Sequence, residues 1–240
     1  MPQRTEILPL IVLILVAGGV LAFAGLAAEV REGGTRSFDE TVLLSLREPA
    51  NRADPVGPRW LEEMMRDFTA LGSHGVVTLL TLGVCAFLAL DGKYRAALLV
   101  LIAVGGAMIW SPLLKEGFQR ARPDLVPHGQ LVFTHSFPSG HSMLAAAAYL
   151  SMGALLARVQ PRRRIKTFLI VFAVLLTLVV GFSRVYLGVH WPTDVLAGWT
   201  AGAIWALLCW FLARWLQRRG EVEQPLPPEG EGLSQESSSR

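Results

Sequence analysis

The stretch TFLIVFAVLLTLVVGFSRVYL, residues 167–187, decides the class of fold. A bilayer core is crossed by about 20 residues of mostly apolar helix, and this stretch has about that length. Arg184 lies near its end, so we expect the last helical turn to lie at the membrane interface. Five further apolar runs occur at roughly residues 7–27, 71–90, 96–114, 142–157 and 195–213. Together the runs predict an all-α, polytopic membrane protein, a bundle of six transmembrane helices.

The overall composition supports this class. Of the 240 residues, 52% are hydrophobic and 17% are charged, and the mean hydropathy is +0.44. A soluble domain usually carries about 25% charged residues. The formal net charge of +3 is small, so no nucleic-acid partner is expected. The two cysteines, Cys85 and Cys209, lie within apolar runs, so we expect buried thiols rather than a disulfide framework or a metal site.

The first apolar run could be a secretory signal, because Ala22-Phe23-Ala24 resembles a small-residue cleavage site. However, the run is longer than the typical signal core of about 7–15 residues. Arg4 is also the only basic residue that precedes it. We therefore expect a retained membrane anchor.

The distribution of basic residues predicts the orientation. Six spans place both termini on one side of the membrane, together with the connecting segments 91–95 and 158–166. The segment 158–166 holds five basic residues, and short basic loops usually face the cytoplasm. Both termini are therefore expected to be cytoplasmic. The opposite, extracytoplasmic side would carry the long segment 28–70 and the loops 115–141 and 188–194.

The segment 28–70 is too polar to span and is predicted to be an interfacial helical segment between the first two transmembrane helices. After Pro58, apolar residues recur at helical spacing with charged residues between them, which is typical of an amphipathic helix. Ser37 and Glu40 form a capping-box pattern that predicts the start of an earlier helix. The segment could gate lipid access or simply cover the bundle.

Two domains follow from these observations. Residues 1–216 are expected to form the membrane domain. Residues 217–240 are rich in Glu, Pro, Gly and Ser, which predicts a disordered cytoplasmic tail. The sequence indicates no obligate protein partner, and the bilayer itself is the partner that the apolar runs require.

Three short polar stretches stand at the ends of apolar runs. They are KEGFQRARP at 115–123, PSGH at 138–141 and SRVYLGVHWPTD at 183–194. On the predicted topology all three face the same, extracytoplasmic side. Ionisable groups in or next to a membrane are energetically expensive, so their collection on one face predicts a functional site.

The PSGH stretch is suited to binding an anion. Pro138 ends what precedes it, and Ser139 is a good N-cap for the long apolar helix that follows. The free N–H groups and the positive end of the helix dipole attract anions, and Gly140 lets an anion approach the backbone closely. His141, on the first turn, could exchange a proton with a bound group.

The two other stretches supply cations and a second histidine. Lys115 and Arg122 are seven residues apart, so a continuous helix ending at Pro123 would place them on one face. Arg184 would add a second guanidinium, and guanidinium groups match phosphate oxygens in a bidentate way. These cations predict a phosphate site.

His190 and Asp194 complete the predicted site. We expect His190 in a surface loop and Asp194 in the first turn of the next helix, after Pro192. The carboxylate could hold one ring nitrogen and leave the other as a nucleophile or base. Each charged or titratable residue alone has a structural explanation, such as snorkelling or helix capping, but the collected set does not. The neighbours Glu116, Arg120 and Asp124 are expected only to tune the field, and His74, His128 and His135 to be interface or loop residues.

These residues resemble the type 2 phosphatidic acid phosphatase superfamily of membrane lipid phosphatases. The pattern of that family is Lys, six residues, Arg-Pro; then Pro-Ser-Gly-His; then Ser-Arg, five residues, His, three residues, Asp. Every element is matched here in identity, order and spacing. The resemblance covers roughly residues 7–216, and a three-part match is far more specific than a single short motif.

The resemblance implies a role for each matched residue. His190 would form a phosphohistidine, Asp194 would orient it, and His141 would protonate the leaving group. The phosphoryl oxygens would be held by Lys115, Arg122, Ser139, Gly140 and Arg184. No metal and no cofactor would be required. The compact size resembles bacterial members of the family, which implies an inner-membrane protein whose site faces the periplasm or exterior.

The substrate implied is a lipid phosphate or pyrophosphate: undecaprenyl pyrophosphate, phosphatidylglycerol phosphate or phosphatidic acid. Two alternatives remain open at this point. The same phosphohistidine could transfer its phosphoryl group to an acceptor lipid. A non-catalytic lipid-phosphate binding or transport protein would need the arginines but not the two histidines and Asp194.

Overall fold

The computed structural model describes residues 3–130 and 134–218. Within these residues the chain forms eight helices and one antiparallel hairpin. The helices are α1 (Gln3–Glu32), α2 (Arg36–Ser45), α3 (Arg59–Ala70), α4 (His74–Leu90), α5 (Tyr94–Phe118), α6 (Gly140–Val159), α7 (Arg163–Tyr186) and α8 (Pro192–Arg218), and the strands are β1 (Arg47–Glu48) and β2 (Asn51–Pro55).

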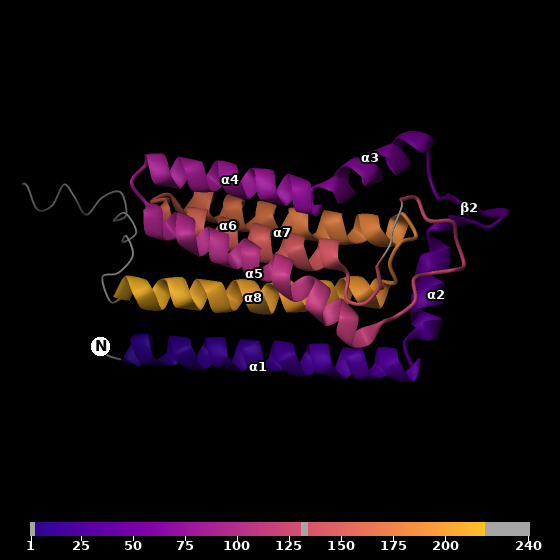
Figure 1. Cartoon of the computed structure of the whole chain (residues 1–240), viewed down its shortest axis with the longest axis horizontal. Coiled ribbons are helices and arrows are strands. Elements are labelled where there is room, and N and C mark those ends of the chain that lie inside the picture. Colours follow the sequence, from indigo (N-terminus) through magenta and orange to yellow (C-terminus); the bar gives the residue numbers. More distant parts are fainter. Residues whose placement is uncertain (1–2, 131–133, 219–240) are drawn as a thin grey trace, which may run out of the picture.

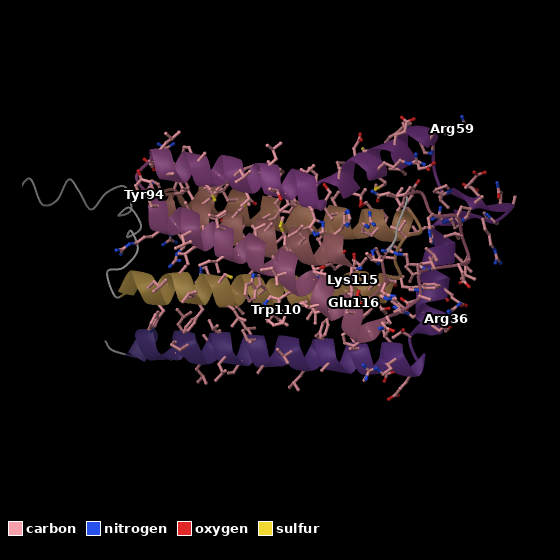
Figure 2. All side chains as sticks on the ribbon, in the orientation of Figure 1. Arg36, Arg59, Tyr94, Trp110, Lys115 and Glu116 are labelled. Carbon is pink, nitrogen blue, oxygen red and sulfur yellow. The ribbon has the colours of Figure 1, made fainter. Side chains whose placement is uncertain are left out.

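The long helices lie side by side along one axis, as Figure 1 shows. α2 lies across one end of this bundle, and α3 leans away from its axis at the same end. The start of α1 and the end of α8 lie together at the opposite end (Figure 1). Nitrogen and oxygen atoms gather near α2, around Lys115 and Glu116, whereas carbon predominates along the middle of the bundle (Figure 2). This is the distribution expected of a helical bundle with an apolar middle.

Five helices are long and apolar enough to cross a membrane: α1, α5, α6, α7 and α8. The remaining predicted span, 71–90, corresponds to α4, which has 17 residues and is preceded by α3. Taken as a pair, α3 and α4 also meet the criteria for a span, but they are bent by 54° at the break between them. The predicted membrane-spanning helical bundle is thus confirmed, while the interfacial position of α3 stays a prediction.

α6 is the centre of the bundle. It packs against α5, α7 and α8, and of the five long helices it has the largest buried share. Its sequence run, 142–157, is the shortest of the six, yet Ala145, Ala146, Ala147 and Ala148 are fully buried. Small side chains let neighbouring helices approach closely, so this helix is largely surrounded by protein, whereas the other long helices are more exposed.

Gly198 on α8 marks a close approach to the start of α6. A Cβ atom at this position would lie 2.6 Å from the Ser139 carbonyl oxygen and 3.0 Å from the Ser142 Cβ. We therefore expect Gly198→Ala to lower the free energy of unfolding by about 1–3 kcal/mol, as overpacked cores do. Gly105→Ala on α5 is the matched control, because nothing lies within 4 Å of its added Cβ.

Thermal unfolding of the detergent-solubilised variants provides the measurement. The control should match or exceed the wild type, because alanine is a better helix former than glycine. A Gly198→Ala protein as stable as the Gly105→Ala protein would show that α8 can shift away from α6 without cost.

The segment 28–70 differs from the prediction in two respects. It is not wholly helical, because β1 and β2 form a hairpin between α2 and α3. Arg47 of β1 is buried, and its Nη2 donates to the Tyr186 carbonyl oxygen at 2.9 Å. The predicted capping box is also wrong, because α2 begins at Arg36 and Glu40 pairs with that arginine instead of closing a cap on Ser37.

α3 covers the end of α7, as one of the two predictions for this segment proposed. Its apolar face, including Leu61 and Met65, packs on Tyr186, Leu187 and Val189. α3 thereby covers the end of α7 from which Arg184 enters the site described next.

Candidate active site

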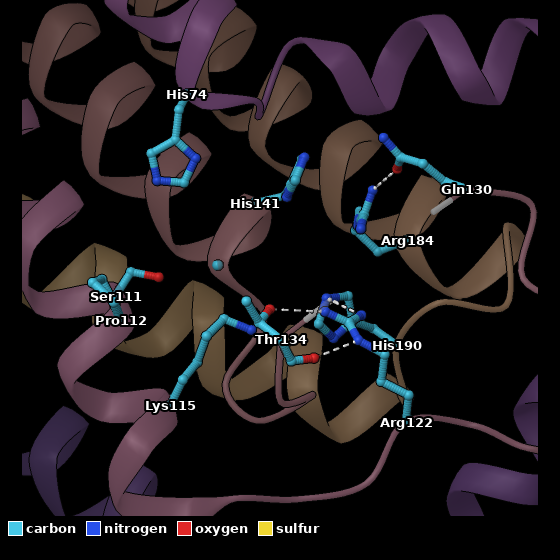
Figure 3. Close-up of a pocket in the computed structure, with 11 residues that line it drawn as sticks. His74, Ser111, Pro112, Lys115, Arg122, Gln130, Thr134, His141, Arg184 and His190 are labelled. Atoms are coloured by element: carbon cyan, nitrogen blue, oxygen red, sulfur yellow. Dashed lines mark hydrogen bonds between the residues drawn. The ribbon is translucent and has the colours of Figure 1, made fainter. Parts of the chain in front are cut away.

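The three polar stretches meet at the end of the bundle that carries α2. They surround a cavity of about 270 Å³, drawn in Figure 3. Six of the eight predicted residues line it, and Ser139 and Asp194 lie behind its wall. The lining residues are His74, Ser111, Pro112, Lys115, Arg122, Gln130, Thr134, Gly140, His141, Arg184 and His190.

The start of α6 forms one wall of the cavity, and its cap is the predicted one. Ser139 is the N-cap, and its hydroxyl accepts from the Ser142 amide at 3.4 Å and from the Ser142 hydroxyl at 2.8 Å. Gly140 follows as the first helical residue, and a Cβ there would lie 3.0 Å from Ser111 Oγ and 3.3 Å from Lys115 Cε. The glycine thus keeps the backbone of the first turn close to the lysine.

Lys115 and Arg122 converge, but not on a continuous helix as predicted. α5 ends at Phe118, because Gln119 adopts a left-handed conformation (φ 50°) and its amide bonds the Lys115 carbonyl oxygen. A residue in the left-handed conformation ends a helix, so α5 stops before Pro123 is reached. Arg122 therefore reaches the cavity from the loop that follows α5.

Backbone carbonyls hold both cations in place. The Lys115 ammonium donates to the His135 carbonyl oxygen at 2.6 Å. The Arg122 guanidinium donates to the carbonyl oxygens of Thr134 at 2.7 Å and Val189 at 2.6 Å. Burial lowers the pKa of Arg122 from its ordinary value, an effect that the carboxylate of Asp194 opposes.

His190 lies between Asp194 and Arg122, and Figure 3 shows it beside Arg122. Its Nδ1 is 3.3 Å from Asp194 Oδ2, and its Nε2 is 3.2 Å from Arg122 Nη1. Because a carboxylate accepts and a guanidinium only donates, this geometry requires the proton on Nδ1 and a lone pair on Nε2. The lone pair is on the nitrogen that faces Arg122 at the cavity.

His190 is not in a surface loop, as the sequence had led us to expect, because its side chain is 1% exposed. Burial, and then the cations Arg184, Arg122 and Lys115, lower the pKa of His190 well below its ordinary value of 6.5. The imidazole is therefore neutral near pH 7 and keeps its lone pair.

Arg184 enters the cavity from the last turn of α7 and is 1% exposed. Its Nη1 donates to Thr69 Oγ1 of α3 at 2.7 Å and to Gln130 Oε1 at 2.5 Å (Figure 3). The amphipathic segment thus supplies a side chain that holds a predicted site residue. Neither Thr69 nor Gln130 carries a sequence signal that could have identified it.

His74, predicted to be an interface residue, lines the cavity from the start of α4, as His141 does from α6 (Figure 3). The sequence did contain a signal for the position of His74. The predicted topology puts the start of the 71–90 run on the same side as the PSGH stretch. The two other histidines lie in the loop between α5 and α6, where the His128 ring contacts the Pro123 carbonyl oxygen.

Asp194 is fully buried and its carboxylate is saturated with donors. Oδ2 accepts from the Ser136 hydroxyl and from the Trp191 amide, at 2.9 Å for the latter. Oδ1 accepts from Arg120 Nη1 at 2.6 Å. Arg120, which we had expected only to tune the field, is therefore a direct partner of Asp194.

Comparisons with known proteins identify the family. A family model described as the PAP2 superfamily matches residues 95–218. Phosphatidylglycerophosphatase B of Bacillus subtilis is 34% identical over 200 residues, which are 81% of this chain and 90% of that protein. An undecaprenyl-diphosphatase of Sulfolobus acidocaldarius is 37% identical over 69 residues, 29% of each chain.

A solved structure shares the fold. The crystal structure of a transmembrane PAP2 type phosphatidylglycerolphosphate phosphatase from Bacillus subtilis superposes with a TM-score of 0.76 at 31% identity. The superposition covers 85% of this chain and 98% of that one. Since the family model matches more than half of the chain, and the Bacillus subtilis relative is matched over 90% of its length, the chain belongs to the PAP2 superfamily.

Proposed function

We propose that this chain removes a phosphoryl group from a lipid phosphate or pyrophosphate through a phosphohistidine on His190. The proposal rests on the orientation and protonation of the His190 ring. Nδ1 is held by Asp194, and Nε2 presents a lone pair to a cavity that Lys115, Arg122 and Arg184 line. An oriented, neutral nucleophile among fixed cations is what attack on a phosphate ester requires.

The first chemical step would form the phosphoenzyme. The Nε2 lone pair attacks phosphorus, and the bond from phosphorus to the leaving oxygen breaks. His141, on the first turn of α6, would be protonated while the negative phosphoryl group lies beside it, and donates its proton to that oxygen. The lipid alcohol, or the lipid monophosphate when the substrate is a pyrophosphate, leaves.

The second step would return the enzyme to its starting state. His141, now neutral, accepts a proton from a water molecule as that water attacks the phosphohistidine. The bond from phosphorus to Nε2 breaks, and inorganic phosphate is released. His190 is again neutral with its proton on Nδ1.

The cations would neutralise the charge that develops on the phosphoryl oxygens. Arg184 Nε is buried and has no hydrogen-bond partner among residues 3–130 and 134–218, so it retains a donor that an anion could use. The free N–H groups at the start of α6, beside Gly140, would bind a further oxygen. Ser139 would act through the cap that shapes this turn. The proposed mechanism needs no metal, because the protein's own cations would supply the positive charge.

The relatives indicate which lipid to test first. The Bacillus subtilis protein, matched over most of its length, is a phosphatidylglycerophosphatase. We therefore propose phosphatidylglycerol phosphate as the leading substrate. Undecaprenyl pyrophosphate and phosphatidic acid come next.

The proposed location is a bacterial inner membrane, with the site facing the periplasm or exterior. This orientation rests on the basic residues at the opposite end of the bundle, near the turn between α6 and α7. Both termini would then be cytoplasmic. The tail from 217 onward lies almost wholly outside the described residues, and its predicted disorder stays a prediction.

Phosphate release from purified, detergent-solubilised protein tests the function. The three lipids would be assayed with and without a metal chelator. We expect release from phosphatidylglycerol phosphate at the same rate in both conditions. Loss of release with chelator, restored by a divalent cation, would contradict the metal-independent mechanism.

The same assay separates the alternatives. If no phosphate is released, an acceptor lipid such as diacylglycerol or undecaprenol is added with labelled substrate. Label appearing on the acceptor would establish a phosphotransferase with the same intermediate. Binding of the lipid with neither release nor transfer would establish a non-catalytic binding protein.

A further inference from the structure

A charged network lies behind the catalytic wall, on the side of Asp194 away from the cavity lining. Arg120 bridges two carboxylates: Nη1 donates to Asp194 Oδ1 at 2.6 Å, and Nη2 donates to Asp39 Oδ2 at 2.7 Å. Both aspartate side chains are fully buried, and the arginine side chain is 14% exposed. Neither Asp39 nor Arg120 lines the cavity. Whatever they contribute must therefore act through Asp194.

Asp39 also holds the start of α8. It comes from α2, the helix that crosses the end of the bundle (Figure 1). Its Oδ1 accepts from the Thr193 amide at 2.9 Å, and its Oδ2 accepts from the Thr193 hydroxyl at 2.7 Å. A carboxylate on the N–H groups of a first helical turn is stabilising, and this is the turn that carries Asp194. Arg120 closes the ring by donating to Thr193 Oγ1 at 2.8 Å.

The charge balance explains why both contacts matter. A buried carboxylate is costly unless it is paired, and removing one partner leaves an uncompensated charge. Arg120 offsets the charge of Asp194, and Asp39 holds Nη2 of Arg120, so that the guanidinium does not rotate away from Asp194. A planar guanidinium can bridge two carboxylates in this way, whereas the point charge of a lysine cannot.

We propose that Asp39 and Arg120 are positioning residues for the His190–Asp194 pair, and that α2 is therefore a working part of the enzyme and not only a cover. Arg120 keeps Asp194 ionised and aimed at Nδ1, so that the lone pair stays on Nε2. Asp39 holds Arg120 and the first turn of α8 in the relative positions that this contact requires. The inference rests on the proposed phosphohistidine mechanism.

Paired substitutions on α2 and in the loop test the proposal. Arg120→Met should lower kcat by about 100-fold and Asp39→Asn by about 10-fold, with KM little changed, because the cavity lining is intact. Arg36→Met and Glu40→Gln are matched controls. They make the corresponding changes on α2, in an exposed ion pair. Arg36 lies over the Trp191 ring but pairs with Glu40 and Asp124 and not with Asp194, so both variants should stay within about twofold of the wild type.

Arg120→Met could lose structure, so Arg120→Lys is added. It keeps the charge but reaches only one carboxylate, and we expect an intermediate loss of about 10-fold in kcat. Thermal unfolding of each variant gives the folded fraction under assay conditions. Losses in kcat that merely follow the folded fraction would overturn the proposal, as would wild-type kcat in Asp39→Asn and Arg120→Lys.

The pH at which His190 and Asp194 take up a proton gives a second measurement. It would not change if Asp39 and Arg120 only stabilised the fold. His190 and Asp194 titrate as a coupled pair, faced by Lys115 of α5, Arg122 of the loop, His141 of α6 and Arg184 of α7, besides Arg120. Removing the Arg120 cation makes proton uptake by the pair easier, so it should occur at higher pH. Removing the Asp39 anion makes proton uptake by the pair harder, so it should occur at lower pH. The two controls should leave it unchanged.

Carbon-13 NMR of histidine-labelled protein measures this titration without substrate. The chain has five histidines, and the spectrum of His190→Gln assigns the signal. A wild type that releases no phosphate from any lipid would defeat the proposed function and leave this test intact. An unmoved His190 titration in Arg120→Met and Asp39→Asn would defeat the positioning role and leave the proposed function intact.

Discussion

Replacing His190 by glutamine should reduce kcat by at least about 10⁴-fold, because it removes the atom that attacks phosphorus. Glutamine is close to histidine in size and can still contact Asp194 and Arg122. It has no lone-pair nitrogen that could form a phosphoenzyme. The measurement is phosphate release from phosphatidylglycerol phosphate, followed with labelled substrate so that a trapped phosphoprotein can also be detected.

Two controls make the His190 result interpretable. The side chain is 1% exposed, so the thermal unfolding midpoint must be measured beside the activity. His128→Gln makes the same change at an exposed histidine that does not line the cavity, and should keep wild-type turnover. Normal turnover by His190→Gln, or acid-labile labelled protein in that variant, would rule out His190 as the nucleophile.

Replacing Arg184 by methionine should lower kcat/KM by about 10³-fold or more, the effect of removing an arginine from a phosphoryl-transfer site. The guanidinium projects into the cavity and is held by Thr69 and Gln130, so its position is set before substrate arrives. Arg184→Lys keeps the charge but loses the planar guanidinium that binds two phosphate oxygens at once, and should recover only part of the activity.

The stability of the Arg184→Met protein should be equal to or greater than that of the wild type. Arg184 is a buried cation whose Nη1 partners in the described residues are neutral, so methionine removes a desolvation cost at the price of two hydrogen bonds. Thermal unfolding and kcat/KM should therefore change in opposite directions. A variant that loses both together would indicate that Arg184 mainly supports the fold, and one that keeps kcat/KM would exclude it from phosphate binding.

Much of the site was predictable because several of its interactions join residues that are close together in the sequence. Ser139 caps α6 as its position before an apolar run indicates, and His190 and Asp194 face each other because they are four residues apart at a helix start. Hydrophobic length likewise predicted the bundle of long helices. In each case the deciding interaction is between neighbours in the chain or between a segment and the bilayer.

Other features escaped prediction because they depend on partners distant in sequence. Arg122 reaches the cavity only because one left-handed residue, Gln119, ends α5 early. The buried hairpin residue Arg47 is paired with a carbonyl 139 residues away. No periodicity marks either arrangement.

The sequence by itself determined the class of protein, the long helices and the identity of six cavity-lining residues, since composition and local spacing set these. Only the tertiary structure decided that Arg120 joins Asp194, 74 residues away, to Asp39, 81 residues away. Such a contact arises because burying two carboxylates demands a shared cation, and which cation is within reach depends on how α2 crosses the end of the bundle.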